Sequence, residues 1–188
     1  IVSQYMSNPR RKHWEVVKHI FRYLQGTEDA QLAFGSANPT KVKGCTNSDY
    51  AKNLDNLKST SRYIFTYGSG AISWRSKLQE CTTLSTIEAE YIVASKKQYG
   101  CIDCQLISHS QVKLTTQHFS QSAIHLIWDP IYHAKTKHIE VRFHHIRELI
   151  TKKKLEVQKI DTKVNIANCL TKPLLEQRFG ALRTKMGL

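Results

Sequence analysis

The longest stretch of helical periodicity begins near residue 85 and extends to about residue 109. Its apolar residues recur at spacings of three, four and seven or their sums: Ile87, Tyr91, Ala94, Cys101, Ile102 and Leu106. Ser85 and Glu88 stand three apart just before this run, which is the capping-box spacing of a helix start. Glu90 lies beside the apolar stripe. That position suits either a solvent-facing glutamate or a carboxylate that shares a metal site with a neighbouring sheet.

Alternating apolar and polar residues predict strands elsewhere in the chain. The expected strands cover residues 41–50, 60–67, 71–74, 112–118 and 155–160. Gly68-Ser69-Gly70 is a tight-turn sequence, so the second and third strands should form a hairpin. A further short strand is a candidate at residues 32–35, before a loop at residues 36–40.

Other segments have helical spacing. Asn8-Pro9 predicts the start of an N-terminal helix that ends at Gly26, with an apolar stripe of Trp14, Val17, Phe21 and Leu24. This stripe should dock on another surface, such as a domain outside the fragment. Further helical patterns cover residues 122–128, 137–153 and 165–182, the last interrupted at Pro173. The order of elements predicts an α/β (mixed) fold with helices packed on a mixed sheet.

The charge of the chain favours a polyanionic partner. Its 188 residues fit one domain with a short appendage, and the net charge is +13. A membrane surface fits less well, because the basic runs do not alternate with bulky apolar residues, and no apolar run approaches the roughly 18 residues of a membrane span. We see no signal peptide, and the missing initiator Met suggests a piece of a longer chain.

Cysteine usage indicates a reducing compartment. The chain has five cysteines without regular spacing. Cys101 and Cys104 form a single Cys-x-x-Cys without a second pair at zinc-finger spacing, so we interpret them as small core residues.

Several phrases of the chain, in order and nearly from end to end, resemble one family: the ribonuclease H domain that ends the Pol polyprotein of copia-type LTR retrotransposons. The matching phrases lie at residues 5–9, 13–15, 22–27, 58–61, 73–79, 84–91, 120–124, 132–142 and 170–174. The resemblance implies a ribonuclease H-like fold, with a five-stranded mixed sheet flanked by helices and preceded by an N-terminal helix. It also implies three parts: a reverse transcriptase tail at 1–36, the ribonuclease H-like domain at 37–172, and a helical tail at 173–188.

Enzymes of this family hydrolyse the RNA strand of an RNA–DNA hybrid with two Mg²⁺ or Mn²⁺ ions held by about four carboxylates. Of those positions this chain keeps Glu90. The family phrase Thr-Asp-Ala-Asp is Thr46-Asn47-Ser48-Asp49 here, and the two other positions hold Phe119 and Asn168. The resemblance therefore implies a pseudoenzyme that does not bind the metals as a pair and in which hydrolysis is lost or weak.

Asp49 is the acid nearest to the substituted positions. It lies two residues beyond Asn47 and, in a strand, on the same face, but displaced by roughly 6–7 Å. One alternative is therefore a single metal held by Glu90, Asp49 and water. A second is an active nuclease that recruits Asp49 and another acid such as Asp161. A third is a decayed, non-enzymatic remnant that binds nucleic acid weakly or serves as a structural interaction module.

Binding of nucleic acid depends on basic and hydroxyl groups and can outlast catalysis. By resemblance, the residues near the hybrid are Ser59, Trp74, Arg75, Lys77, Gln121, Ser122, His133, Lys137, His138 and Arg142. Trp74 beside Arg75 and Lys77 suits a stacking platform, although packing is an equally good role for each residue alone. The implied partners are an RNA–DNA hybrid or another nucleic acid, and the reverse transcriptase portion of the same polyprotein, without a membrane. The implied location is intracellular, in a cytoplasmic particle or the nucleus.

Overall fold

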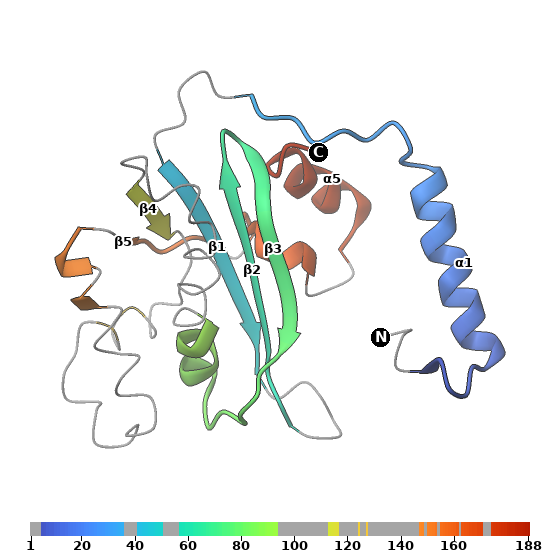
Figure 1. Ribbon diagram of the computed structural model, residues 1–188, viewed down its shortest axis with the longest axis horizontal. Coiled ribbons are helices and arrows are strands. Elements are labelled where there is room, and N and C mark those ends of the chain that lie inside the picture. Colours follow the sequence, from blue (N-terminus) through green and yellow to red (C-terminus); the bar gives the residue numbers. More distant parts are fainter. Residues whose placement is uncertain are drawn as a thin grey trace. The chain divides into compact units, whose positions relative to one another are not determined.

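A five-stranded mixed sheet forms the centre of the computed structural model (Figure 1). The structure describes residues 5–35, 41–50, 57–93, 113–116, 124, 127, 147–148, 150–153, 155–161, 163–170 and 174–188. The strands are β1 (Lys41–Asp49), β2 (Thr60–Tyr67), β3 (Gly70–Leu78), β4 (Lys113–Thr116) and β5 (Leu155–Val157). Their order is β3-β2-β1-β4-β5, with the first three antiparallel and β4 and β5 parallel to β1. The predicted mixed sheet is confirmed.

The hairpin of β2 and β3 is longer than its sequence pattern predicts. Its turn has positive φ at Gly68 (56°) and Ser69 (68°), as in a type I′ turn, whose twist suits a two-residue hairpin. β3 runs to Leu78 rather than ending at Trp74. The added residues 75–77 are exposed on this edge strand, so they carry no apolar alternation that would reveal the strand.

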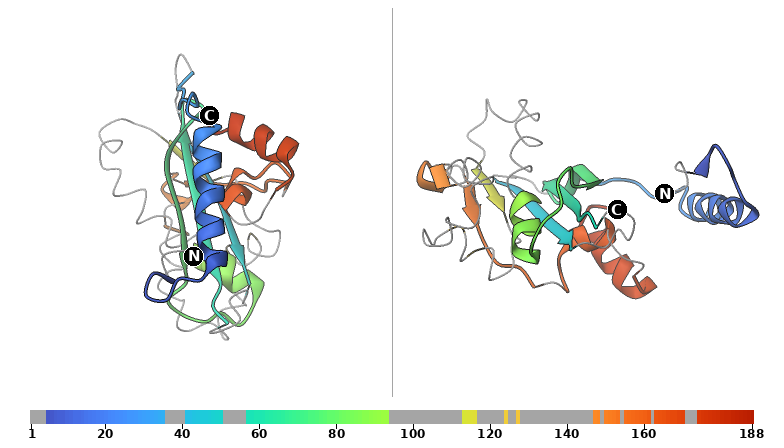
Figure 2. Two further views of the ribbon diagram at one scale, coloured as in Figure 1. Left: turned by 90° about the vertical axis from the view of Figure 1, so that its right-hand side faces the viewer. Right: turned by 90° about the horizontal axis from the view of Figure 1, so that it is seen from below.

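Both faces of the sheet are covered, because neighbouring β2 residues Ile64 and Phe65 are both buried. On the Ile64 face lie the 3₁₀-helix η5 (Ile166–Leu170) and the helix α5 (Glu176–Thr184), drawn together on one side of the sheet in Figure 2. They close a core formed by Cys45, Ile64, Ala71, Ile166, Ala167, Leu182 and Met186. The segment expected as a helical tail thus contributes side chains to this core.

Residues 86–93 form the described part of the predicted long helix. The Ser85 hydroxyl accepts a hydrogen bond from the Glu88 N–H (3.1 Å), and the Glu88 carboxylate accepts one from the Leu84 N–H (2.7 Å). The predicted cap is therefore present. The Glu88 carboxylate binds the N–H of Leu84, which is one residue before the N-cap N–H that it binds in a standard capping box. Gln79 Nε2 donates to Ser61 Oγ (2.9 Å) and to the Ala89 carbonyl (3.0 Å), which ties this helix to β2. Its expected continuation to residue 109, with Cys101 and Cys104, lies outside the described residues.

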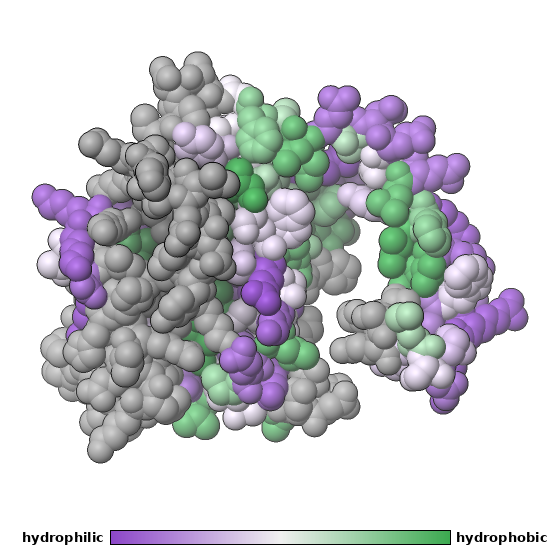
Figure 3. Space-filling view, in the orientation of Figure 1, coloured by the Kyte–Doolittle hydropathy of each residue, from purple (hydrophilic) through white to green (hydrophobic). Residues whose placement is uncertain are grey.

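The chain divides into two units, Ile1–Gln31 and Leu32–Leu188. The first contains α1 (Arg11–Gln25), which ends at Gly26 as predicted. The predicted start at Asn8-Pro9 is wrong: the N-cap is Arg10, whose N–H donates to His13 Nδ1 (3.0 Å). The helix has no buried residue, and its apolar side chains are visible as the green part of this unit in Figure 3. The exposed large ones are Trp14, Val16, Ile20, Phe21, Tyr23 and Leu24.

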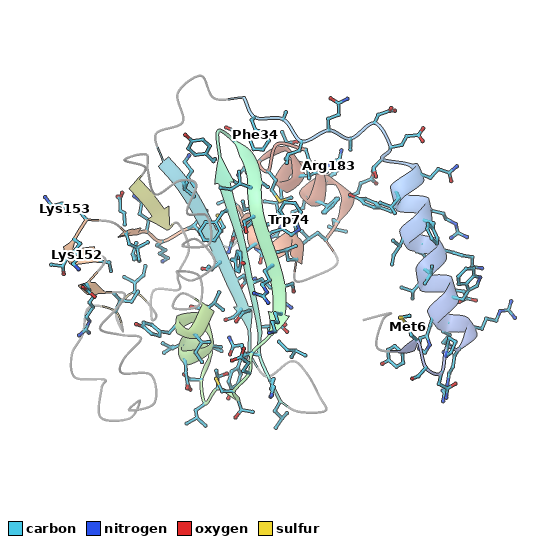
Figure 4. All side chains as sticks on the ribbon, viewed as in Figure 1. Met6, Phe34, Trp74, Lys152, Lys153 and Arg183 are labelled. Carbon is cyan, nitrogen blue, oxygen red and sulfur yellow. The ribbon has the colours of Figure 1, made fainter. Side chains whose placement is uncertain are left out.

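Residues 32–35 are extended but do not form the predicted strand. The Ala33 N–H donates to the Gly187 carbonyl (2.7 Å), and the Gly35 N–H donates to the Gly68 carbonyl (2.9 Å). Gly187 has φ +82°, and a Cβ at that position would overlap the Ala33 carbonyl oxygen. A Cβ at Gly70 would lie 2.5 Å from the ring of Phe34, which Figure 4 labels near the hairpin turn. The two glycines therefore allow the chain end and the hairpin to approach residues 33–34 closely.

Candidate metal centre and nucleic-acid surface

Two of the family carboxylate positions meet in the structure as a pair of amides. Asn47 lies near the end of β1, and Asn168 lies on η5 with 2% of its surface exposed. Asn47 Nδ2 donates to Asn168 Oδ1 at 2.7 Å. The predicted convergence of these positions is therefore present, although the interaction is a neutral hydrogen bond.

The short helix η5 is held against β1 by a third asparagine. Asn165 is fully buried, and its Nδ2 donates to the Thr46 carbonyl (2.9 Å). Its Oδ1 accepts the Ala167 N–H (3.0 Å), which satisfies a donor in the first turn of η5. Both ends of this amide are thus paired with backbone, and they position Asn168 opposite Asn47.

Asp49 of β1 accepts hydrogen bonds from two residues of β2. Its Oδ2 accepts a hydrogen bond from Arg62 Nη2 (2.8 Å), and its Oδ1 accepts the Thr60 N–H (2.6 Å). The side chains of Arg62 and Asp49 are 7% and 16% exposed. Burial tends to raise the pKa of Asp49, but the bonds from Arg62 and Thr60 together with the Arg62 charge outweigh it, so this pKa lies below its usual value. Asp49 is therefore an ionised partner of Arg62, with both oxygens occupied.

The other candidate acids are Glu90 and Asp161. Glu90 is partly exposed on the helix at 86–93, between the buried Ala89 and Tyr91. Asp161 is exposed and accepts the Lys163 N–H (2.7 Å). Across the part of the chain that the structure describes, no three His, Cys, Asp or Glu side chains gather at metal-binding distance. Phe119 lies outside that part.

The described residues of this centre do not fit the pair of Mg²⁺ or Mn²⁺ ions that the family implies. Such ions need anionic oxygens aimed at both of them. Here Asn47 turns its Nδ2, a donor, toward Asn168, and the Asp49 oxygens are bound to Arg62 and Thr60. Two ionised carboxylates as close as these amides would repel without a cation between them. The two amides are joined by a neutral hydrogen bond and bring no negative charge to a metal ion.

The predicted nucleic-acid residues divide into three groups. Ser59 is fully buried and hydrogen-bonded to Thr83 Oγ1 (2.9 Å), which favours the packing role over a contact with nucleic acid. Trp74, Arg75 and Lys77 are exposed on β3, where Figure 4 labels Trp74. Strand alternation sends Trp74 to one face of the sheet and the two cations to the other. Outside the described residues lie Gln121, Ser122, His133, Lys137, His138 and Arg142.

Sequence reasoning missed Arg62 and Asn165. Arg62 lies in an alternating strand pattern that predicts its face but gives no sign that a guanidinium is buried there. Asn165 begins the predicted terminal helical region, where an asparagine is a common cap, and that preference was the available signal. Nearby, burial raises the pKa of the Cys169 thiol, although the Arg178 charge opposes the shift, so this cysteine favours the neutral form.

Comparison with known proteins shows which family the chain belongs to. No protein-family model matches the chain. The chain is 44% identical over 192 residues to the retrovirus-related Pol polyprotein from transposon TNT 1-94 of Nicotiana tabacum, a match that covers 100% of this chain and 14% of that protein. It is 32% identical to the corresponding polyprotein from transposon RE2 of Arabidopsis thaliana, again over 100% of this chain and 13% of the relative. The chain belongs to the retrovirus-related Pol polyproteins of transposons.

The fold of this Pol segment is that of ribonuclease H. LC11-RNase H1, isolated from compost, superposes with a TM-score of 0.51 at 15% identity over 69% of this chain and 91% of that protein. The predicted ribonuclease H-like fold is thereby confirmed. The segment spans about one seventh of the length of the Pol relatives that it matches. Within its described residues, no helix combines the length and the apolar character that a membrane crossing needs.

Proposed function

We propose that this chain is a ribonuclease H-like domain of a transposon Pol polyprotein that binds RNA–DNA hybrid and has lost hydrolysis of the RNA strand or retains little of it. The observation that carries the proposal is the Asn47–Asn168 hydrogen bond, at two of the positions where the family has carboxylates. Two-metal hydrolysis uses one ion to generate the attacking hydroxide and the other to stabilise the leaving oxygen. A pair of neutral amides offers neither ion the charge that holds it.

The native chain should leave the RNA strand of a labelled hybrid intact in Mg²⁺ or Mn²⁺, at enzyme-to-substrate ratios at which LC11-RNase H1 degrades it. Glu90→Gln should not change the amount of cleavage, because no pair of metal ions is expected beside this carboxylate. The measurement is cleavage resolved on a denaturing gel. Robust turnover that Glu90→Gln abolishes would contradict the proposal. Turnover abolished by Asp49→Asn would favour the nuclease that recruits Asp49.

Hybrid binding should survive, because phosphate contacts need cations rather than carboxylates. The net charge of +13 and the exposed Trp74, Arg75 and Lys77 on the edge strand support this part of the proposal. Phosphate neutralisation would make the affinity fall steeply with salt. We propose that His133, Lys137, His138 and Arg142 of the basic segment also contact the hybrid.

Trp74→Ala should weaken hybrid binding by about 5–150-fold, the range that corresponds to the loss of one base–aromatic stacking contact. Trp14→Ala is the matched control, because both tryptophans are 60% exposed and only Trp74 lies on the sheet. Fluorescence anisotropy of a labelled hybrid measures both affinities across a salt series. Equal losses in the two variants would mean that Trp74 is no stacking platform. Weak binding with the salt dependence of any basic protein would favour a decayed remnant.

The proposed context is the polyprotein itself, at an intracellular site such as a cytoplasmic particle or the nucleus. The apolar side chains exposed along α1 suit a protein partner, and the chain spans only a small part of its Pol relatives. The reverse transcriptase portion of the same polyprotein is the proposed partner of this helix.

A further inference from the structure

Arg62 is a buried cation next to the amide pair. It lies on β2 directly opposite Asn47 of β1, so the two residues share a face of the sheet. Only 6% of its surface is exposed. Asp49, two residues along β1, lies on that same face and binds its Nη2. The guanidinium therefore belongs to the group that surrounds the former carboxylate position.

The rest of this guanidinium makes no hydrogen bond within the described part of the chain. Nε and Nη1 are buried there without a hydrogen-bond partner. An arginine side chain keeps its charge at any pH at which a protein is folded, and all its polar atoms are donors. Its remaining N–H groups can donate hydrogen bonds to an anionic oxygen, and its positive charge repels a metal ion. The face beside Asn47 is thus already supplied with a fixed positive charge.

We propose that Arg62 is the resident cation of this centre and that it keeps divalent metal out. This inference rests on the proposed loss of the two-metal reaction and gives it a second, independent cause. Arg62 binds the Asp49 carboxylate, which lies two residues along β1 from Asn47 on the same face of the sheet. A carboxylate restored at position 47 would face a guanidinium that is already in place and already dehydrated. The metal pair would therefore not return when the family carboxylates alone are restored.

The test uses Mn²⁺ alone as the probe and the full chain carrying N47D, F119D and N168D, which restores the family pattern beside Glu90. This restored chain is compared with the same chain carrying also Arg62→Gln, which keeps a hydrogen-bond donor for Asp49 and removes the charge. Arg22→Gln in the restored chain is the control, since it removes one exposed positive charge from α1. Electron paramagnetic resonance of free Mn²⁺ measures binding, and thermal unfolding with and without Mn²⁺ measures it independently.

We expect no saturable binding by the restored chain or by its Arg22→Gln form, and binding at least about tenfold tighter after Arg62→Gln, as expected for removing a nearby like charge. If the Arg62→Gln form folds only with metal, recovery of its near-ultraviolet circular dichroism on adding Mn²⁺ is the readout. Equal Mn²⁺ binding with and without Arg62 would overturn the inference, and so would an absence of binding in both forms. Neither result affects the cleavage and hybrid-binding assays of the native chain, which test the proposed function separately.

Discussion

Replacing Arg62 by leucine is expected to lower the free energy of unfolding by about 3–5 kcal/mol, the usual effect of removing one partner of a buried ion pair. The change leaves the Asp49 carboxylate in a setting where its side chain is only 16% exposed. The Thr60 N–H would remain its described hydrogen-bond donor. Urea unfolding followed by circular dichroism measures the loss. Arg75→Leu, at an exposed position on the neighbouring strand, should stay within about 0.5 kcal/mol of the native chain.

The double variant Asp49→Asn with Arg62→Leu should be more stable than the sum of the single changes implies. It removes both charges of the pair, so neither charge stays buried without its partner. The pH dependence provides a second check. The pKa of Asp49 is lower in the folded protein than in the unfolded one, so its contribution to stability is complete above about pH 4 and disappears as the pH falls through the lower, folded value. Asp49→Asn should remove this part of the acid-side loss. Additive single changes, or an unchanged acid limb, would mean that the pair is energetically unimportant.

The second large effect is expected at Asn165, where Asn165→Asp should cost about 2–4 kcal/mol at neutral pH. The substitution is nearly isosteric, but it removes the donor to the Thr46 carbonyl and directs a carboxylate oxygen at that carbonyl. Asn165 is fully buried, so water cannot replace the lost bond. Chemical denaturation at neutral and at acid pH tests this, and the cost should shrink in acid, where the introduced carboxyl becomes protonated.

Asn8→Asp introduces the same charge at an exposed position and should have little effect on unfolding. A loss at Asn165 no larger than that control would show that η5 does not depend on this amide for its place on β1. The acid-induced recovery distinguishes a buried charge from a general disturbance of packing.

The paired strands at the centre of the sheet could be predicted closely from the sequence. The pattern of residues 60–67 predicts a strand, and β2 has those bounds, with both Ile64 and Phe65 buried. β3 was underestimated because an edge strand can expose polar residues on both sides. The start of α1 was misplaced by two residues, since the His13 side chain caps the Arg10 N–H and the favourable Asn8 side chain is not used.

The candidate site was predictable only as a set of positions. Phrase matching located Asn47 and Asn168, which the fold brings into contact. It also placed Ser59 near the hybrid, and the structure shows the Ser59 hydroxyl buried and hydrogen-bonded to Thr83. The burial of Arg62 depends on segments distant in sequence, which cover both faces of β2. Local sequence patterns contain no information on such packing, so the ion pair of Arg62 with Asp49 could be found only in the structure.

The hydrogen bonds of Ala33 with Gly187 and of Gly35 with Gly68 bring the entry and the exit of the second unit to one corner. A domain whose two ends adjoin can be inserted into a loop of another protein without stretching its host, and its ends can be joined directly in a circular permutant. The sheet unit of this chain is therefore well suited to transfer as a cassette, with new ends placed in a surface loop away from that corner.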